Sequence, residues 1–274
     1  MNTPLVANPD AVLPSSEGGG GIFEQLFGHV FPHKVGEFQL FGTVIEYYTL
    51  TFFQVGAVLA VFLSFAGVAV AIRTNGGNAV QRGMSGFVSF IREEMVHPYL
   101  GRKDGDRMLP LFLSLFFFIM FQNLFGLFPG GATATASVYV SAALALITFA
   151  TMIVGGMVIQ GPVKFWLRLV PHVPGPLWPL MFVIELVGLC VKPFALTVRL
   201  TANMMGGHLV LLSFLGLVLY FGSMNPVAGW AFAPVGVGLS VFIMIIEGFV
   251  ALLQAYIFTL LSIIFVGMCL HPDH

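Results

Sequence analysis

The sequence contains little charge, which limits the classes of protein it can encode. Only 11 Lys and Arg residues and 12 Asp and Glu residues occur among 274, or 8%, whereas soluble domains contain about 25% charged residues. A soluble globular protein is therefore excluded. The formal net charge of -1 provides no basic surface for a phosphate backbone, so we expect no nucleic-acid partner.

Cysteine is also scarce, and several site motifs are missing. Cys190 and Cys269 lie in apolar surroundings and form no CxxC pair, so neither a disulfide framework nor a zinc site is indicated. The chain has no HExxH motif and no G-x-x-x-x-G-K-[ST] loop for nucleotide phosphates. We therefore expect no cofactor and no metal.

Apolar residues are abundant, at 58% of the chain. Because one helical crossing of a bilayer needs about 20 apolar residues, the sequence predicts an all-α polytopic membrane protein with about five membrane helices. Basic residues mixed with apolar ones at three- and four-residue spacings predict an amphipathic surface helix as well, with a solvated helix as the alternative. The expected helices are at about residues 47–72, 109–128, 137–160, 179–221 and 235–269, and the surface helix is at about residues 80–98.

Residues 1–45 are polar and contain several prolines and a run of glycines, which favours a flexible tail outside the membrane domain of residues 46–274. The tail resembles neither a cleaved signal nor an organelle transit peptide. Lys and Arg gather in alternate loops of the membrane domain, while the opposite side has only Lys34. The positive-inside rule then places the N-terminus outside and the C-terminus in the cytoplasm. We expect a bacterial plasma membrane, with an organelle inner membrane as the alternative.

The last two apolar segments are too long for upright crossings. Residues 179–221 would form a helix of roughly 64 Å, against a hydrocarbon core of about 30 Å. No polar loop interrupts the segment, and an open turn in lipid would leave backbone groups unpaired. We expect a single helix, kinked at Pro193 and strongly tilted, that forms a hairpin with the last helix near Asn225 and Pro226. Such a hairpin presents an extended face to a partner in the membrane.

Ionisable residues occur inside these two segments, where each costs at least about 2.5 kcal/mol. Four polar residues of the first helix are separated by seven, seven and four positions, which places them on one face of that helix. His208 points about 180° away from Arg199. Glu247 and Gln254 share a face of the last helix. The four residues on the first helix are Glu185, Lys192, Arg199 and Asn203.

These side chains differ in the chemistry they offer. Arg199 cannot lose its proton and would form a fixed positive barrier, whereas Glu and His can pass protons on. Structural alternatives remain for the others. Glu185 and Lys192 could extend to the inner interface, and Asn203 and Gln254 could be hydrogen-bond partners between helices.

Residues 192–208, KPFALTVRLTANMMGGH, resemble the signature around the essential arginine of subunit a of the rotary F-type ATP synthase. Glu247 with residues 254–260, QAYIFTL, is similar to the last helix of that family, and residues 121–129, FQNLFGLFP, to its early hairpin. The resemblance covers about residues 109–270. The tail of residues 1–45 contributes nothing to it.

The resemblance implies a non-catalytic, ion-translocating subunit beside a ring of c subunits, with b-type peripheral stalk subunits and a soluble catalytic sector as further partners. It implies that Arg199 is essential and lies between two half-channels. Some family members exchange the acid and the histidine that this chain has at Glu247 and His208, which leaves the order of proton transfer open. The resemblance also places Asn203 and Gln254 in the outer half-channel and Glu185 in the inner one. The choice between H⁺ and Na⁺ depends on the ring, which is another chain.

A secondary transporter with an intramembrane Arg and Glu substrate site is the alternative function. An internal repeat would favour it. The sequence shows no such repeat, and the intramembrane charges cluster in the last third of the chain without counterparts in the first half.

Overall fold

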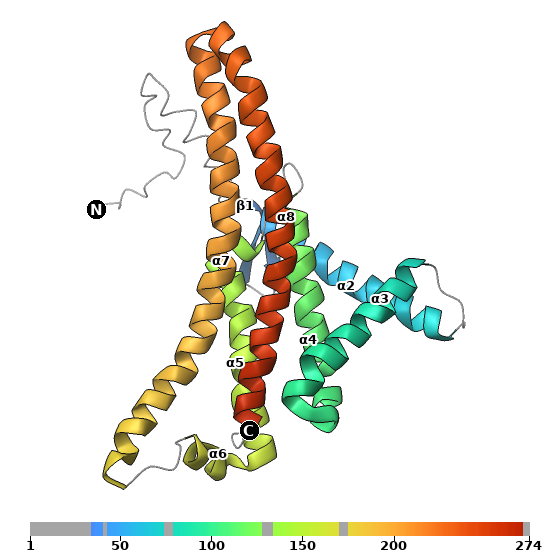
Figure 1. The fold of residues 1–274 in the computed structure, drawn as a ribbon, viewed down its shortest axis with the longest axis vertical. Coiled ribbons are helices and arrows are strands. Elements are labelled where there is room, and N and C mark those ends of the chain that lie inside the picture. Colours follow the sequence, from blue (N-terminus) through green and yellow to red (C-terminus); the bar gives the residue numbers. More distant parts are fainter. Residues whose placement is uncertain (1–33, 41–42, 74–78, 128–133, 170–174, 271–274) are drawn as a thin grey trace.

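The computed structural model describes residues 34–40, 43–73, 79–127, 134–169 and 175–270. Within these ranges the chain is a bundle of long helices with one small sheet (Figure 1). Four helical stretches are long and apolar enough to cross a membrane, at residues 82–126, 138–160, 178–224 and 226–270, and residues 51–67 form a shorter apolar helix. The predicted all-α membrane fold is confirmed.

The chain enters the bundle through a two-stranded antiparallel sheet, formed by β1 (Lys34–Leu40) and β2 (Thr43–Tyr48). The sequence predicted a flexible tail for residues 1–45, but residues 34–40 and 43–45 belong to this sheet. Residues 1–33 and 41–42 lie outside the described part of the chain. Helix α2 (Thr49–Arg73) follows directly. It begins within two residues of the first expected helix.

The expected surface helix is α3 (Ala79–Phe90) continued by a π-helical segment, η1 (Ile91–Val96). The chain then reverses at Gly101, whose φ of 70° favours glycine. Arg92 forms a two-pronged ion pair with Asp106, at 2.8 Å for each contact, and His97 Nε2 lies 2.9 Å from Asp106 Oδ1. Helix α4 (His97–Gly126) begins well before the expected residue 109, because charged residues of its first turns pair with η1 and with one another.

Helix α5 (Val138–Gln160) follows a short 3₁₀ turn, η2 (Ala134–Ala136), and packs against α7 and α8. Helix α6 (Pro162–Arg168) is short and turns away from the end of α5 at Gly161, whose φ is 88°. A further 3₁₀ turn, η3 (Gly175–Leu177), precedes α7. The largest fully buried side chains of the core include Phe112, Phe117, Met152, Phe258 and Ile263.

The last third of the chain is the expected hairpin of two long helices, α7 (Trp178–Met224) and α8 (Pro226–Leu270). At 47 and 45 residues each is roughly 70 Å long, and together they extend beyond the rest of the bundle (Figure 1). Helix α8 begins at Pro226 rather than near residue 235, because proline suits the first turn of a helix. At the turn, Gly222 and Gly229 pack so closely that a Cβ on Gly229 would lie 2.6 Å from the Cα of Gly222.

Candidate functional site

The facing surfaces of α7 and α8 carry two cross-helix contacts between polar side chains. His208 Nε2 of α7 lies 3.9 Å from Glu247 Oε1 of α8. Asn203 Nδ2 donates a hydrogen bond of 2.8 Å to Gln254 Oε1. The structure therefore brings together four of the predicted site residues in two layers between the helices. The titratable layer consists of His208 and Glu247, and the amide layer consists of Asn203 and Gln254.

Glu247 is buried, with 5% of its surface exposed, and its Oε1 has no hydrogen-bond partner in the described part of the chain. The distance to His208 is too long for a hydrogen bond but short enough for electrostatic coupling. A buried polar atom without a protein partner is ordinarily satisfied by water. Glu247 Oε1 is therefore an atom that an ordered water could satisfy.

Gly207 lies against the Glu247 carboxyl and was not among the residues predicted from the sequence. A Cβ at this position would lie 2.6 Å from Glu247 Oε1 and 2.7 Å from its Cδ, closer than side chains tolerate. Glycine at this position lets the Glu247 carboxyl rest against the backbone of α7. The signal in the sequence was the glycine pair that precedes His208 on an otherwise bulky apolar helix.

Polar contacts continue from α8 toward α4 and η2, through residues that were not among the candidates. Asn123 Nδ2 donates to the Ala251 carbonyl at 3.3 Å, and Thr135 Oγ1 donates to Asn123 Oδ1. Gln122 is fully buried, and neither atom of its amide group has a partner within the described ranges; the same holds for Gln254 Nε2. These atoms on α4 and α8 need hydrogen-bond partners, which ordered water ordinarily supplies to buried polar groups.

Arg199 is exposed on α7, one helical turn before Asn203. It forms no hydrogen bond or ion pair with any part of the chain that the structure describes. Phe194 and Val198, its neighbours on α7, are 68% and 47% exposed. A permanent charge on an apolar membrane surface needs an anion, and the described residues do not supply one.

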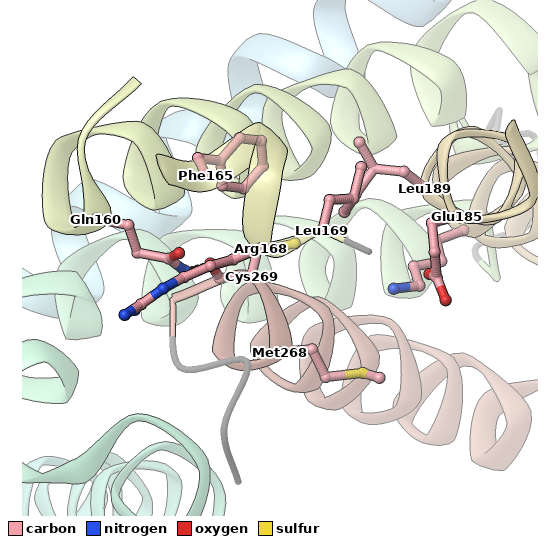
Figure 2. Close-up of a pocket in the computed structure, with 9 residues that line it drawn as sticks. Gln160, Phe165, Arg168, Leu169, Glu185, Leu189, Met268 and Cys269 are labelled. Carbon is pink, nitrogen blue, oxygen red and sulfur yellow. Dashed lines mark hydrogen bonds between the residues drawn. The ribbon is translucent and has the colours of Figure 1, made fainter. Parts of the chain in front are cut away.

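Glu185 and Lys192 lie away from this region and line a cavity of about 100 Å³ between α5, α6, α7 and α8. Figure 2 shows the cavity with Gln160, Arg168 and Cys269 on its other sides. The Lys192 ammonium lies 5.4 Å from the centre of the Phe265 ring. The face shared by Glu185, Lys192 and Arg199 in the sequence pattern therefore divides into two environments, a half-buried cavity and an exposed surface.

No group of three or more His, Cys, Asp and Glu residues in the described ranges is arranged to hold a metal ion. Cys190 and Cys269 are both free thiols. The ionisable groups are instead distributed along two long apolar helices. Fold and site together define a multi-pass membrane protein with titratable residues enclosed between its helices.

Comparison with known proteins gives the family. Residues 49–267 match the family model described as "ATP synthase A chain". The chain therefore belongs to the ATP synthase A chain family, and the resemblance found in the sequence is confirmed.

Several relatives are bacterial. "ATP synthase subunit a" of Anaeromyxobacter dehalogenans strain 2CP-C is 45% identical over 196 residues, covering 69% of this chain and 50% of the relative. The protein of the same name from Myxococcus xanthus strain DK1622 is 42% identical over 192 residues, covering 68% and 61%. "ATP synthase subunit a 2" of Chlorobaculum tepidum is 35% identical over 253 residues, covering 90% and 69%. The chain spans about half the length of the Anaeromyxobacter relatives.

Proposed function

We propose that this chain is the ion-conducting stator subunit of an ATP synthase membrane sector, and that Arg199 faces a ring of c subunits. The observation that supports the proposal most strongly is the exposed Arg199 on an apolar helix surface, without an anionic partner among the described residues. Such a charge becomes favourable when a partner brings a carboxylate to it in the membrane. A c subunit with one membrane carboxylate has the chemistry that this surface lacks.

Arg199 would act as both clamp and barrier. A ring carboxylate that reaches the guanidinium gives up its proton and is held as an anion by a charge that cannot be neutralised. The same charge repels a proton that would pass directly along α7. One elementary charge that crosses 100 mV releases about 2.3 kcal/mol, so the energy of ion flow becomes available only when the ring turns.

The outer half-channel would run through the Glu247 and His208 layer and then the Asn203 and Gln254 layer toward Arg199. His208 lies roughly 13.5 Å beyond Arg199 along the helix axis, and Asn203 lies between them. Glu247 and His208 can each bind a proton, whereas the two amides can only orient water. The buried Glu247 Oε1 and Gln254 Nε2, which lack protein partners in the described part of the chain, are the atoms that such waters would satisfy.

The inner half-channel would open at the cavity beside Glu185 and Lys192. Glu185 precedes Arg199 by roughly 21 Å of helix, on the side opposite to His208. Two routes that end on opposite sides of one fixed charge form the offset arrangement that rotation requires. Glu185 would accept protons released on this side.

The remaining partners and the orientation belong to the same proposal. We infer a bacterial plasma membrane with the N-terminus outside and the C-terminus in the cytoplasm, because the loops on one side carry the basic residues. The b-type stalk subunits would hold the chain against the ring, and a soluble catalytic sector would supply the nucleotide chemistry. The secondary-transporter alternative loses its support, because the chain belongs to the ATP synthase A chain family.

ATP-driven acidification of inverted membrane vesicles tests this function. Arg199→Ala and Arg199→Lys should both abolish acidification while the ring still co-purifies with the chain. Lysine lacks the planar fork of arginine and loses its proton more readily when buried. If either variant acidifies the vesicles as fast as the parent, Arg199 does not hold the ring carboxylate and the proposal fails.

A further inference from the structure

Gln160, the last residue of α5, binds the C-terminal end of α8. Its Nε2 donates hydrogen bonds of 2.7 Å to the Cys269 carbonyl and 3.2 Å to the Leu270 carbonyl. The last carbonyls of a helix have no partner within the helix. The Gln160 amide therefore caps α8 from another helix and ties together two segments that lie far apart in the sequence.

The oxygen of the same amide lacks a hydrogen-bond donor among the described residues. Gln160 Oε1 is buried and has no hydrogen-bond partner in the described part of the chain. The amide cannot be reversed to satisfy it, because both nitrogen contacts are carbonyl oxygens, which cannot donate a hydrogen bond to an amide oxygen. The oxygen thus needs a donor that the described residues do not provide.

The cavity beside Gln160 has room for that donor. Gln160 and Glu185 both line the cavity (Figure 2), as does Lys192. The cavity volume of about 100 Å³ exceeds the space that one water occupies. Gly156, one turn earlier on α5, shapes the wall, since a Cβ there would overlap the Phe165 ring. Gln160 and Phe165 are therefore both part of the wall of this cavity.

We infer that Gln160 is a positioning residue of the inner half-channel. Its nitrogen fixes the last turn of α8 against α5, and its oxygen holds an ordered water beside Glu185 and Lys192. This inference rests on the proposed function, because it assigns the cavity to the inner route. It adds a residue on α5 to the proposed pathway residues, which lie on α7 and α8.

The first part of the inference, that Gln160 caps α8, is tested in the assembled complex by chemical labelling of the Cys269 thiol. Cys190→Ser leaves Cys269 as the only cysteine of the chain, and Cys269 is buried. In this background Gln160→Leu should raise the rate of labelling by a water-soluble methanethiosulfonate about tenfold, because the last turn opens once two hydrogen bonds are lost. Met268→Leu, which also alters a cavity-lining residue but removes no hydrogen bond, should leave the rate unchanged.

Gln160→Glu tests whether Gln160 acts through its hydrogen bonds or only through the size of its side chain. An ionised carboxylate cannot donate to the two carbonyls, whereas a protonated one has a single O–H donor. Pumping by this variant in inverted vesicles should therefore be weak at alkaline bath pH and recover as the bath, which contacts the inner side, is acidified. Gln160→Leu should not recover, and Gln160→Met, which preserves the length of the side chain, should behave like Gln160→Leu.

The outcomes distinguish this inference from the function on which it rests. If Gln160→Leu leaves Cys269 labelling and pumping at the parent's values, or if Gln160→Glu and Gln160→Met have the same pH profile, the role of Gln160 is refuted while the role of Arg199 stands. If Arg199→Ala pumps normally, the proposed function fails whatever the Gln160 variants do. A variant counts only when the ring co-purifies with it at the parent's level. If Gln160→Leu and Gln160→Met both prevent assembly, Gln160 is a structural residue and the inference also falls.

Discussion

Gly207→Ala is the substitution whose effect the structure defines most sharply. The new Cβ would lie 2.6 Å from Glu247 Oε1 and 2.7 Å from its Cδ. Alanine otherwise favours a helix over glycine by about 1 kcal/mol, so any loss of function comes from the contact and not from weaker helix formation. The substitution therefore isolates the position of one carboxylate.

The magnitude follows from the distances. To restore an ordinary contact, the Glu247 carboxyl must retreat by roughly 0.8 Å, a movement that the end of a flexible side chain can make at little cost in stability. This movement changes the present separation of 3.9 Å between Glu247 Oε1 and His208 Nε2. Because a 1 Å misplacement of a reacting group can cost about 100-fold in rate, we expect proton pumping to fall by about 10- to 100-fold.

ATP-driven acidification of vesicles, normalised to the amount of assembled complex, measures the effect. Gly238→Ala is the matched control, because it makes the same change on α8 and a Cβ there meets no atom within 4 Å. It should retain the parent's rate within about twofold. If Gly207→Ala pumps as fast as Gly238→Ala, then transport does not depend on the approach of Glu247 to the backbone of α7, and the role assigned to Gly207 is wrong.

Two further predictions concern the cross-helix contacts. Glu247→Gln and His208→Ala should each slow transport and shift its pH optimum, because both side chains can bind a proton and they lie 3.9 Å apart. The outer-half-channel role fails if the rates and pH profiles of both variants match the parent. Asn203→Leu should slow transport by about tenfold, since it leaves Gln254 Oε1 without its donor. Cys190→Ser, at an exposed position on the same helix, should not slow it. Equal rates in the two variants would show that the amide layer is only a structural contact.

The long-range arrangement of the fold could be predicted because lipid imposes strict lengths. The apolar run from Pro179 onward has no polar loop before Asn225, so a single long helix was the only solution that keeps its backbone paired. The small sheet at residues 34–48 could not be predicted from composition, because its pairing depends on a local register rather than on hydrophobicity. The early start of α4 was hidden by charges that pair only after the chain reverses at Gly101.

The site was predictable in its residue types but not in its contacts. Helical spacing placed His208 and Arg199 on opposite faces, and the structure shows His208 toward Glu247 and Arg199 on the exposed surface. Which side chains meet across two helices depends on their axial offset, and the tight turn at Gly222 and Gly229 sets this offset. Gln160 could not be recognised from the sequence, because a polar residue at a helix end looks like an ordinary boundary.

Dissipation of an imposed proton gradient tests the central claim, that Arg199 is the barrier between two half-channels. In vesicles stripped of the catalytic sector, Arg199→Ala should leak protons faster than Arg199→Lys, because lysine retains part of the charge. Adding Glu247→Gln to Arg199→Ala should suppress the leak, since it interrupts the outer route. A double variant that leaks as fast as Arg199→Ala alone would show that protons bypass Glu247. An Arg199→Ala membrane as tight as the parent would contradict the barrier itself.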